Sequence, residues 1–184
     1  MKKIVLIILS IIILNIFVAC NNEIPIQNSW EIYLVSDGIL PQTEKVDINK
    51  LTLEETPVLT LNDIQKYYWD EQVFLTKNDL ILEQIKAHNN HVSTGGLPYV
   101  VVVNGERIYM GKFWTSLSSV WAYSPSIMVD MTFGIDVKQY NIQPDQQLYK
   151  IYWNDEESKT KKAIFDERIY KVLEQNNLLS ELTD

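Results

Sequence analysis

The chain has 184 residues, with 16 Lys and Arg against 24 Asp and Glu, which gives a formal net charge of −8. Nucleic acids and anionic membrane surfaces are bound through positive patches, so this balance argues against both as partners. The length suits one domain with its own hydrophobic core, and the single cysteine excludes a disulfide within the chain.

The chain starts with the features of an export signal. Lys2 and Lys3 precede an apolar run from Ile4 to Ala19 that is interrupted only by Ser10 and Asn15. A positive start, a short apolar stretch and a small residue at its end are typical of a secretory signal. The run is shorter than the about 20 residues that a membrane-spanning helix needs, and it has no basic residue directly behind it.

The only cysteine stands directly behind this run. The stretch Phe17-Val18-Ala19-Cys20 resembles the lipobox of bacterial lipoproteins, with Phe17 where Leu is usual. In those proteins the cysteine thiol receives a diacylglyceryl group, and a peptidase then cuts in front of the cysteine. A thiolate is a strong nucleophile, and two or more acyl chains such as palmitate anchor a protein stably. An uncleaved N-terminal membrane anchor and an ordinary secretory signal are the alternatives.

This interpretation divides the chain into three parts. Residues 1–19 are predicted to be a lipoprotein signal peptide, residues 20–28 a lipidated N-terminus and tether, and residues 29–184 a single globular domain. The expected location is the extracytoplasmic face of the cell membrane, or the outer membrane in a Gram-negative cell. Loss of residues 1–19 would leave 14 basic against 24 acidic side chains, so the lipid alone would hold the domain at a membrane.

The first half of the domain is predicted to alternate short strands with helical turns. The stretch around Pro57 is expected at a sheet edge, because proline cannot donate to a strand ladder. Thr76 or Asn78 is expected to cap a helix, and Thr60 or Asn62 the helical turn before it. The predicted elements are a strand at 30–35, a turn at 36–38, an edge strand or extended segment within 47–61, a helical turn at 61–67, a strand at 72–76 and a helix at 79–87.

The strongest local pattern runs from Tyr99 to Met110. Four valines, the pair Asn104-Gly105 and a second apolar stretch predict a β-hairpin with a type I′ turn, since Asn and Gly tolerate positive φ. The predicted register pairs Val103 with Glu106, Val102 with Arg107, Val101 with Ile108, Val100 with Tyr109 and Tyr99 with Met110. Consecutive valines indicate a strand buried on both faces and hence central, and Gly111 is expected to bend the chain out of it.

The second half is predicted to add further strands and a C-terminal helix. The predicted elements are a strand or short helix at 113–123, strands at 126–137 and 148–153, a charged loop at 154–162, and a helix whose apolar stripe is Phe165, Ile169, Val172 and Leu173. The expected fold class is α+β, with a mostly antiparallel sheet, a central hairpin and two or three packed helices including the C-terminal one.

Two histidines, His88 and His91, are candidates for a metal site if a carboxylate such as Glu83 joins them. Zinc proteases need two histidines four residues apart on a helix, with a Glu between them. Here the spacing is three and the helix is expected to end, so we expect exposed loop histidines and no metal. The sequence contains no nucleophile elbow, phosphate-binding loop or dinucleotide motif, and we expect no catalytic residue and no cofactor.

Aromatic residues gather at four places, which are Tyr67-Tyr68-Trp69, Phe113-Trp114, Trp121 with Tyr123, and Tyr152-Trp153. Neighbouring residues on a strand point to opposite faces, so one ring of each pair can be buried while the other stays outside. Exposed Trp and Tyr rings would form a platform for a glycan, a peptide or a partner protein. The alternative is that these rings are half-buried residues of the sheet.

Two stretches, 55–76 and 95–120, resemble a group of small, uncharacterised lipoproteins and envelope proteins of low-GC Gram-positive bacteria. In that group an E-x-P stretch leads to D-I-x-x-Y-x-W and then to a hairpin that ends in R-I-Y-x-G-x-F-W. The matching residues are Glu55, Pro57, Asp63, Ile64, Tyr67, Trp69, Gly96, Pro98, Arg107, Ile108, Tyr109, Gly111, Phe113 and Trp114. The resemblance covers about a quarter of the chain and implies an envelope location, but no activity.

The expected function is that of a non-enzymatic, lipid-anchored extracytoplasmic protein that binds an envelope protein or glycan. The candidate partner-binding residues are Trp69, Arg107, Tyr109, Phe113 and Trp114. The alternative is a cell-envelope hydrolase that uses carboxylates or the pair His88 and His91. A third interpretation is a purely structural lipoprotein.

Overall fold

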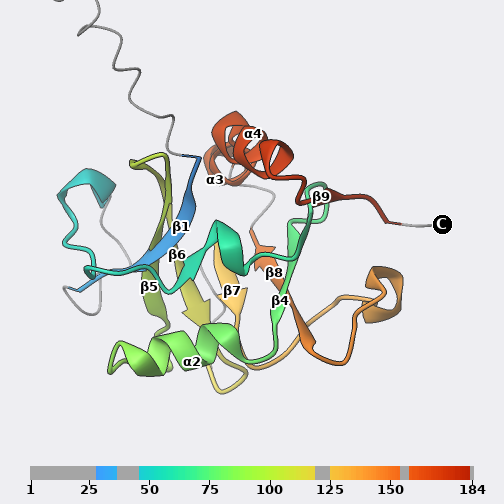
Figure 1. The fold of residues 1–184 in the computed structure, drawn as a ribbon. Coiled ribbons are helices and arrows are strands. Elements are labelled where there is room, and N and C mark those ends of the chain that lie inside the picture. The colour runs from blue at the N-terminus through green and yellow to red at the C-terminus, as the bar shows by residue number, and fades with distance from the viewer. Residues whose placement is uncertain (1–27, 37–45, 119–124, 154–157, 183–184) are drawn as a thin grey trace, which may run out of the picture.

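The computed structural model describes residues 28–36, 46–118, 125–153 and 158–182, and they form one curled sheet with helices at its two ends (Figure 1). The strands are β1 (Trp30–Leu34), β2 (Leu59–Thr60), β3 (Lys66–Tyr68), β4 (Val73–Lys77), β5 (Leu97–Val103), β6 (Glu106–Trp114), β7 (Ser126–Met128), β8 (Gln146–Tyr152) and β9 (Leu179–Ser180). The helices are α2 (Leu80–Ala87), α3 (Ser158–Ile164) and α4 (Glu167–Gln175), and the 3₁₀ turns are η1 (Ile48–Lys50), η2 (Leu61–Asp63) and η3 (Val137–Tyr140).

The described strands follow the order β2-β1-β5-β6-β7-β8-β4-β3-β9. All neighbours are antiparallel except the pairs β6–β7 and β3–β9, which are parallel. The predicted α+β class with a mostly antiparallel sheet and a C-terminal helix is therefore confirmed. The β5–β6 hairpin lies third and fourth in the order, and the middle place belongs to β7.

The concave face of the sheet holds the main hydrophobic core. Alternate residues of each strand point to this face, as the pleat requires. In β1 these residues are Trp30, Ile32 and Leu34, all nearly inaccessible to solvent. Helix α2 closes the core at one end and α3 with α4 at the other (Figure 1). The buried helical residues are Ile81, Ile85, Ile164, Ile169, Val172 and Leu173.

The β5–β6 hairpin confirms the predicted turn and changes the predicted register. Asn104 and Gly105 both have positive φ, 51° and 80°, as a type I′ turn requires. The pairs nearest the turn, at Glu106 and Arg107, are as predicted. A β-bulge opposite Val101 and Val102 then inserts Ile108 as an extra residue, so the partners become Val101–Tyr109, Val100–Met110 and Tyr99–Gly111. The predicted pairs beyond the bulge were wrong by one residue.

Gly111 lies inside β6 instead of ending it, so the predicted bend was wrong. A Cβ at this position would lie 2.4 Å from Cζ and the hydroxyl oxygen of Tyr99 and 2.8 Å from the carbonyl oxygen of Pro125. The glycine therefore leaves room for the Tyr99 ring, which lies across it and contacts the Phe113 ring at a centroid distance of 4.6 Å.

Two predicted segments of the first half are correct in place and different in detail. The helical turn forms as η2, and the Asp63 carboxylate accepts hydrogen bonds of 2.7 Å from both the backbone N–H and the hydroxyl of Thr60. The chain then enters β3 where the helical turn was expected to continue. The stretch around Pro57 ends in β2, an edge strand of the sheet as expected.

Helix α2 begins without the predicted side-chain cap. Asp79 occupies the N-cap position with φ 55°, and its side chain makes no capping hydrogen bond. The Asn78 amide instead donates to the carbonyl oxygen of Pro144, and the Thr76 hydroxyl donates to the carbonyl oxygen of Lys77. These side chains tie the β4–α2 connection to neighbouring backbone and leave none for the helix start.

The second half departs most from its prediction. Strand β7 ends at Met128, and the following segment is held by Tyr152, whose hydroxyl accepts from Phe133 N–H and donates to the Phe133 carbonyl. The predicted loop at 154–162 contains the start of α3. Strand β9 was not predicted, whereas β8 and α4 confirm the predicted strand and C-terminal helix.

No helix within the described ranges is long and apolar enough to cross a membrane. The predicted signal peptide, Cys20 and most of the tether lie outside the residues that the structure describes, as do Trp121, Tyr123 and most of the predicted turn at 36–38.

Candidate binding site around Trp69

Three of the five candidate partner-binding residues lie inside the protein. Tyr109 is 5% exposed, Phe113 0% and Trp114 4%, so their rings contribute to packing and form no surface platform in this structure. Burial raises the pKa of the Tyr109 hydroxyl far above its ordinary value, so this side chain stays neutral at physiological pH. The five candidates therefore do not converge on a single site.

Arg107 has a visible structural role. Its guanidinium donates hydrogen bonds to the carbonyl oxygens of Ile48 and Leu51, the latter at 2.8 Å. These bonds fasten the η1 segment to the outer face of β6. The β-bulge directly after Arg107 shifts the pairing of the following β6 residues with β5 by one residue.

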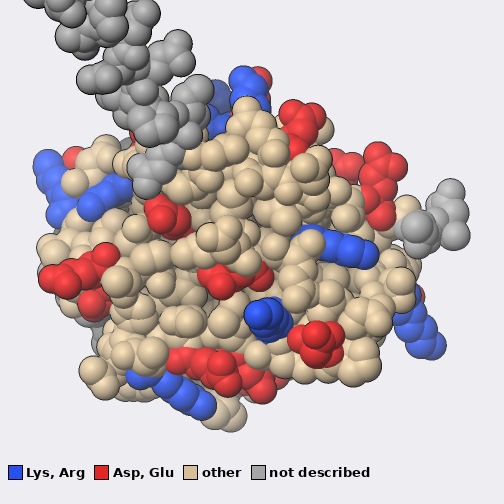
Figure 2. Space-filling model, viewed as in Figure 1, with Lys and Arg blue, Asp and Glu red and all other residues tan. Residues whose placement is uncertain are grey.

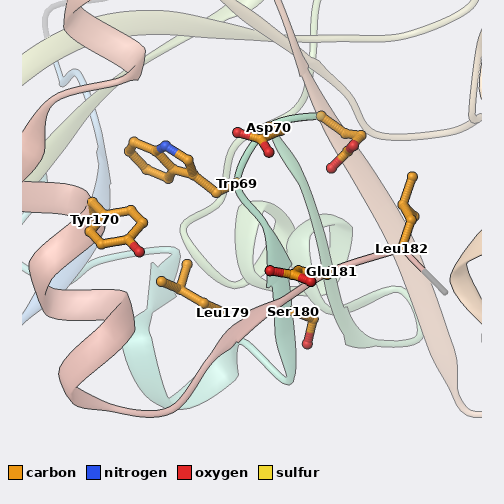
Figure 3. Close-up of a pocket in the computed structure, with 8 residues that line it drawn as sticks. Trp69, Asp70, Tyr170, Leu179, Ser180, Glu181 and Leu182 are labelled. Atoms are coloured by element: carbon orange, nitrogen blue, oxygen red, sulfur yellow. The ribbon is translucent and has the colours of Figure 1, made fainter.

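Trp69 is the candidate that borders a hollow. The hollow has a volume of about 450 Å³, within the range typical of ligand-binding clefts. It is lined by Trp69, Asp70, Glu71, Tyr170, Leu179, Ser180, Glu181 and Leu182. Figure 3 shows Trp69 and Tyr170 on one side of it, Leu182 on the other, and Asp70 and Glu181 between them.

The hollow opens where two parallel strands separate. Strands β3 and β9 pair through Tyr67 with Leu179 and Tyr68 with Ser180. Beyond these pairs the β3 chain turns back into β4, while the chain after β9 runs on. The side chains between the diverging segments come from both, and helix α4 adds Tyr170 at the side (Figure 3).

The turn that carries Trp69 is fixed from below by Gln72, which is 0% exposed. The Gln72 side-chain amide donates to the Trp69 carbonyl at 2.7 Å, and its oxygen accepts a 2.7 Å hydrogen bond from the Tyr67 hydroxyl. Gln72 also has φ 51°, a left-handed conformation that few residue types adopt. The buried amide thus holds both ends of the turn, and Asp70 and Glu71, which lie between them in the chain, line the hollow.

The Trp69 ring is held by neighbouring aromatic rings. The Phe165 ring meets it edge to face, with a centroid distance of 5.5 Å and an interplanar angle of 88°. The Tyr170 ring meets it in the same way, with a centroid distance of 5.3 Å and an interplanar angle of 77°. On the core side, the centroid of the Tyr67 ring lies 6.1 Å from the centroid of the Trp69 ring. Such contacts contribute roughly 0.5 to 1.5 kcal/mol each beyond area burial. The Trp69 ring is therefore held by contacts inside the protein on the side away from solvent.

The electrostatic character of the hollow is negative. Its lining includes the carboxylates of Asp70, Glu71 and Glu181 and no Lys or Arg. Glu71 also acts on Tyr68. The pKa of the Tyr68 hydroxyl is raised mainly by burial and further by the negative charge of Glu71. On the face drawn in Figure 2, by contrast, Lys and Arg side chains lie scattered between Asp and Glu side chains.

The two histidines do not gather further ligands. His88 follows the end of α2, and its Nε2 lies 3.5 Å from the Thr56 hydroxyl, while His91 is exposed. Within the described ranges, no group of three or more His, Cys, Asp or Glu side chains could hold a metal ion.

Seven of the eight residues that line the hollow were not identified from the sequence. The aromatic cluster 67–69 was the one signal that led to this place. Tyr170 lies on the predicted C-terminal helix, but its approach to Trp69 depends on how that helix packs. Residues 179–182 belong to β9 and to the chain that follows it. Strand β9 has only two residues, too few to show the alternation of apolar and polar side chains that marks a strand in a sequence.

Comparison with protein-family models, with curated proteins and with solved structures gives no match.

Proposed function

We propose that this chain is a lipid-anchored extracytoplasmic protein, without catalytic activity, that binds an envelope component at the hollow beside Trp69. The observation that carries the binding function is a hollow of about 450 Å³ whose wall contains Trp69, packed edge to face against Phe165 and Tyr170. Rings that are held before binding lose little conformational entropy when a ligand packs on them.

The location in this proposal depends on the N-terminal sequence. An apolar run that ends in Ala19-Cys20, followed by polar residues, supports acylation of the cysteine and anchoring by lipid. Strand β1 begins at Trp30, so nine residues, 21–29, separate Cys20 from the sheet. A tether of that length leaves room between the membrane and the domain.

The anchor is tested by labelling cells with an alkyne-tagged fatty acid and comparing the natural chain with Cys20→Ser. The proposal predicts an acyl label and a cleaved N-terminus for the natural chain only, with unlabelled precursor for the variant. Equal labelling of both chains would contradict the assignment of Cys20.

Binding is tested with a pair of matched tryptophan variants, Trp69→Leu and Trp153→Leu. Both rings meet Phe165 edge to face, at 5.5 Å and 5.6 Å, but only Trp69 lines the hollow. The full-length chain in nonionic detergent is used to capture envelope components, which are identified by mass spectrometry. We expect the natural chain and Trp153→Leu to retain the same component and Trp69→Leu to lose it. Equal retention of the component by both variants would contradict binding at the hollow.

A further inference from the structure

The hollow combines aromatic rings and carboxylates in a way that selects for charge. We propose that it binds the protonated side chain of a lysine or arginine carried on an extended segment of a partner polypeptide. This inference rests on the proposed function, because it names the chemistry of the component that the hollow would bind.

The walls of the hollow offer two kinds of group that attract cations. Ammonium and guanidinium groups are attracted both to aromatic faces and to carboxylates, which accept charge-assisted hydrogen bonds from them. Trp69 and Tyr170 provide the rings, and Asp70 and Glu181 lie beside them (Figure 3). A phosphate or carboxylate ligand would meet like charges at the same positions. A neutral apolar ligand would gain no electrostatic interaction from these carboxylates.

The carboxylates of the hollow are available to a ligand. Asp70, Glu71 and Glu181 form no ion pair with any described residue, whereas other acidic side chains do. Asp166, for example, is held by Arg168 at 2.8 Å, and Glu167 by Lys171 at 2.8 Å. A cation that enters the hollow therefore displaces no internal partner. The net charge of −8 would further favour the approach of a basic segment.

An edge strand beside the hollow favours a partner in an extended conformation. Strand β9 is the last strand in the order, and within the described ranges only its β3 side is paired. The free main-chain groups of an edge strand can pair with an extended peptide, a common mode of peptide recognition. Both Leu179 and Ser180 of β9 line the hollow, so a segment laid along this edge would pass its rim. A basic side chain of that segment could then enter beside Trp69.

The test uses the full-length chain in nonionic detergent and a decapeptide of alternating Lys and Thr, followed by calorimetry. The same peptide with every lysine acetylated has the same length and lacks the charge. The variant Asp70→Asn/Glu181→Gln removes two charges from the hollow with little change in shape. The control Glu55→Gln/Glu83→Gln removes two charges from exposed positions that do not line it.

We expect the natural chain and the control to bind the lysine peptide equally and the acetylated peptide not measurably. The hollow variant should bind the lysine peptide roughly tenfold more weakly, as expected for the loss of two partly exposed ion pairs. Added salt should weaken binding to the natural chain more than binding to the hollow variant.

Several results would overturn the inference. These are no binding of the lysine peptide, equal binding of the acetylated peptide, or an unchanged affinity of the hollow variant. If free spermidine binds as tightly as the peptide and with the same dependence on Asp70 and Glu181, the ligand is a small cation and the polypeptide part is wrong. The tryptophan variants separate the two proposals: capture that depends on Trp69, without lysine binding, would leave the proposed function intact.

Discussion

The hydroxyl of Tyr67 donates a 2.7 Å hydrogen bond to the side-chain oxygen of Gln72 inside the protein. The same Gln72 amide donates to the carbonyl of Trp69, so one buried side chain connects the core to the wall of the hollow. Buried polar groups are costly unless they are paired, and this pair satisfies both partners. The geometry of the site therefore depends on a residue that no ligand would touch.

Replacing Gln72 with Leu should destabilise the protein by about 1 to 3 kcal/mol, because the Tyr67 hydroxyl would remain buried without a partner. Urea unfolding of the full-length chain in detergent would measure this change. In a Tyr67→Phe background the same replacement should cost less, since no hydroxyl is left unpaired. If the replacement of Gln72 costs the same stability in both backgrounds, the hydrogen bond between Tyr67 and Gln72 does not contribute to stability.

Replacing Gly111 with Ala should destabilise the protein by about 1 to 3 kcal/mol, since the new methyl group would overlap the Tyr99 ring and approach a backbone carbonyl. Gly95 provides the matched control, because a Cβ there would meet only the Ser93 hydroxyl at 3.7 Å. Gly95→Ala should change the stability by less than about 0.5 kcal/mol in the same unfolding measurement. Similar effects at both glycines would contradict the close approach of Tyr99.

The start of α4 should show a pH-dependent contribution from Asp166. Hydrogen bonds from the Arg168 guanidinium hold the pKa of this carboxyl below its ordinary value of 3.8. A depressed folded-state pKa stabilises the fold above the unfolded-state value, and this stabilisation is lost as the pH falls through the folded-state pKa.

The variant Asp166→Asn keeps a capping side chain and loses the charge, whereas Asp166→Ala loses both. At pH 7 we expect Asp166→Asn to cost less than about 1 kcal/mol, because the ion pair is partly exposed, and Asp166→Ala to cost more. The difference between the natural chain and Asp166→Asn should shrink as the pH falls from 7 towards 2, because the carboxyl becomes protonated and loses its charge. Unfolding midpoints that differ equally at pH 7 and pH 2 would contradict a role for the charge.

Much of the fold follows from local sequence patterns. Asn104-Gly105 between apolar stretches was sufficient for the hairpin, because its backbone preference is local. The bulge that inserts Ile108 was not predictable, since it depends on which side chains the curled sheet buries on each face. The short strands β3 and β9 escaped prediction for a related reason: two or three residues carry no period, and tertiary pairing alone defines them.

The candidate site was predicted only through Trp69. Aromatic clustering directed attention to five residues, and burial places three of them in the interior. Sequence alone could not separate a platform from a core ring, because both are made of the same residue types. The hollow forms where β3 and β9 diverge, and these two strands lie more than a hundred residues apart in the sequence. A local sequence pattern therefore cannot predict it.

The most direct test of the account places a photo-crosslinking amino acid on the rim of the hollow, at Leu182, in cells that produce the full-length protein. The same amino acid at Glu83, an exposed position on α2 that does not line the hollow, is the control. If the hollow binds an envelope component, we expect a discrete crosslinked adduct with one such component from Leu182 and none from Glu83. An absence of adducts from Leu182, or the same adducts from both positions, would contradict binding at this hollow.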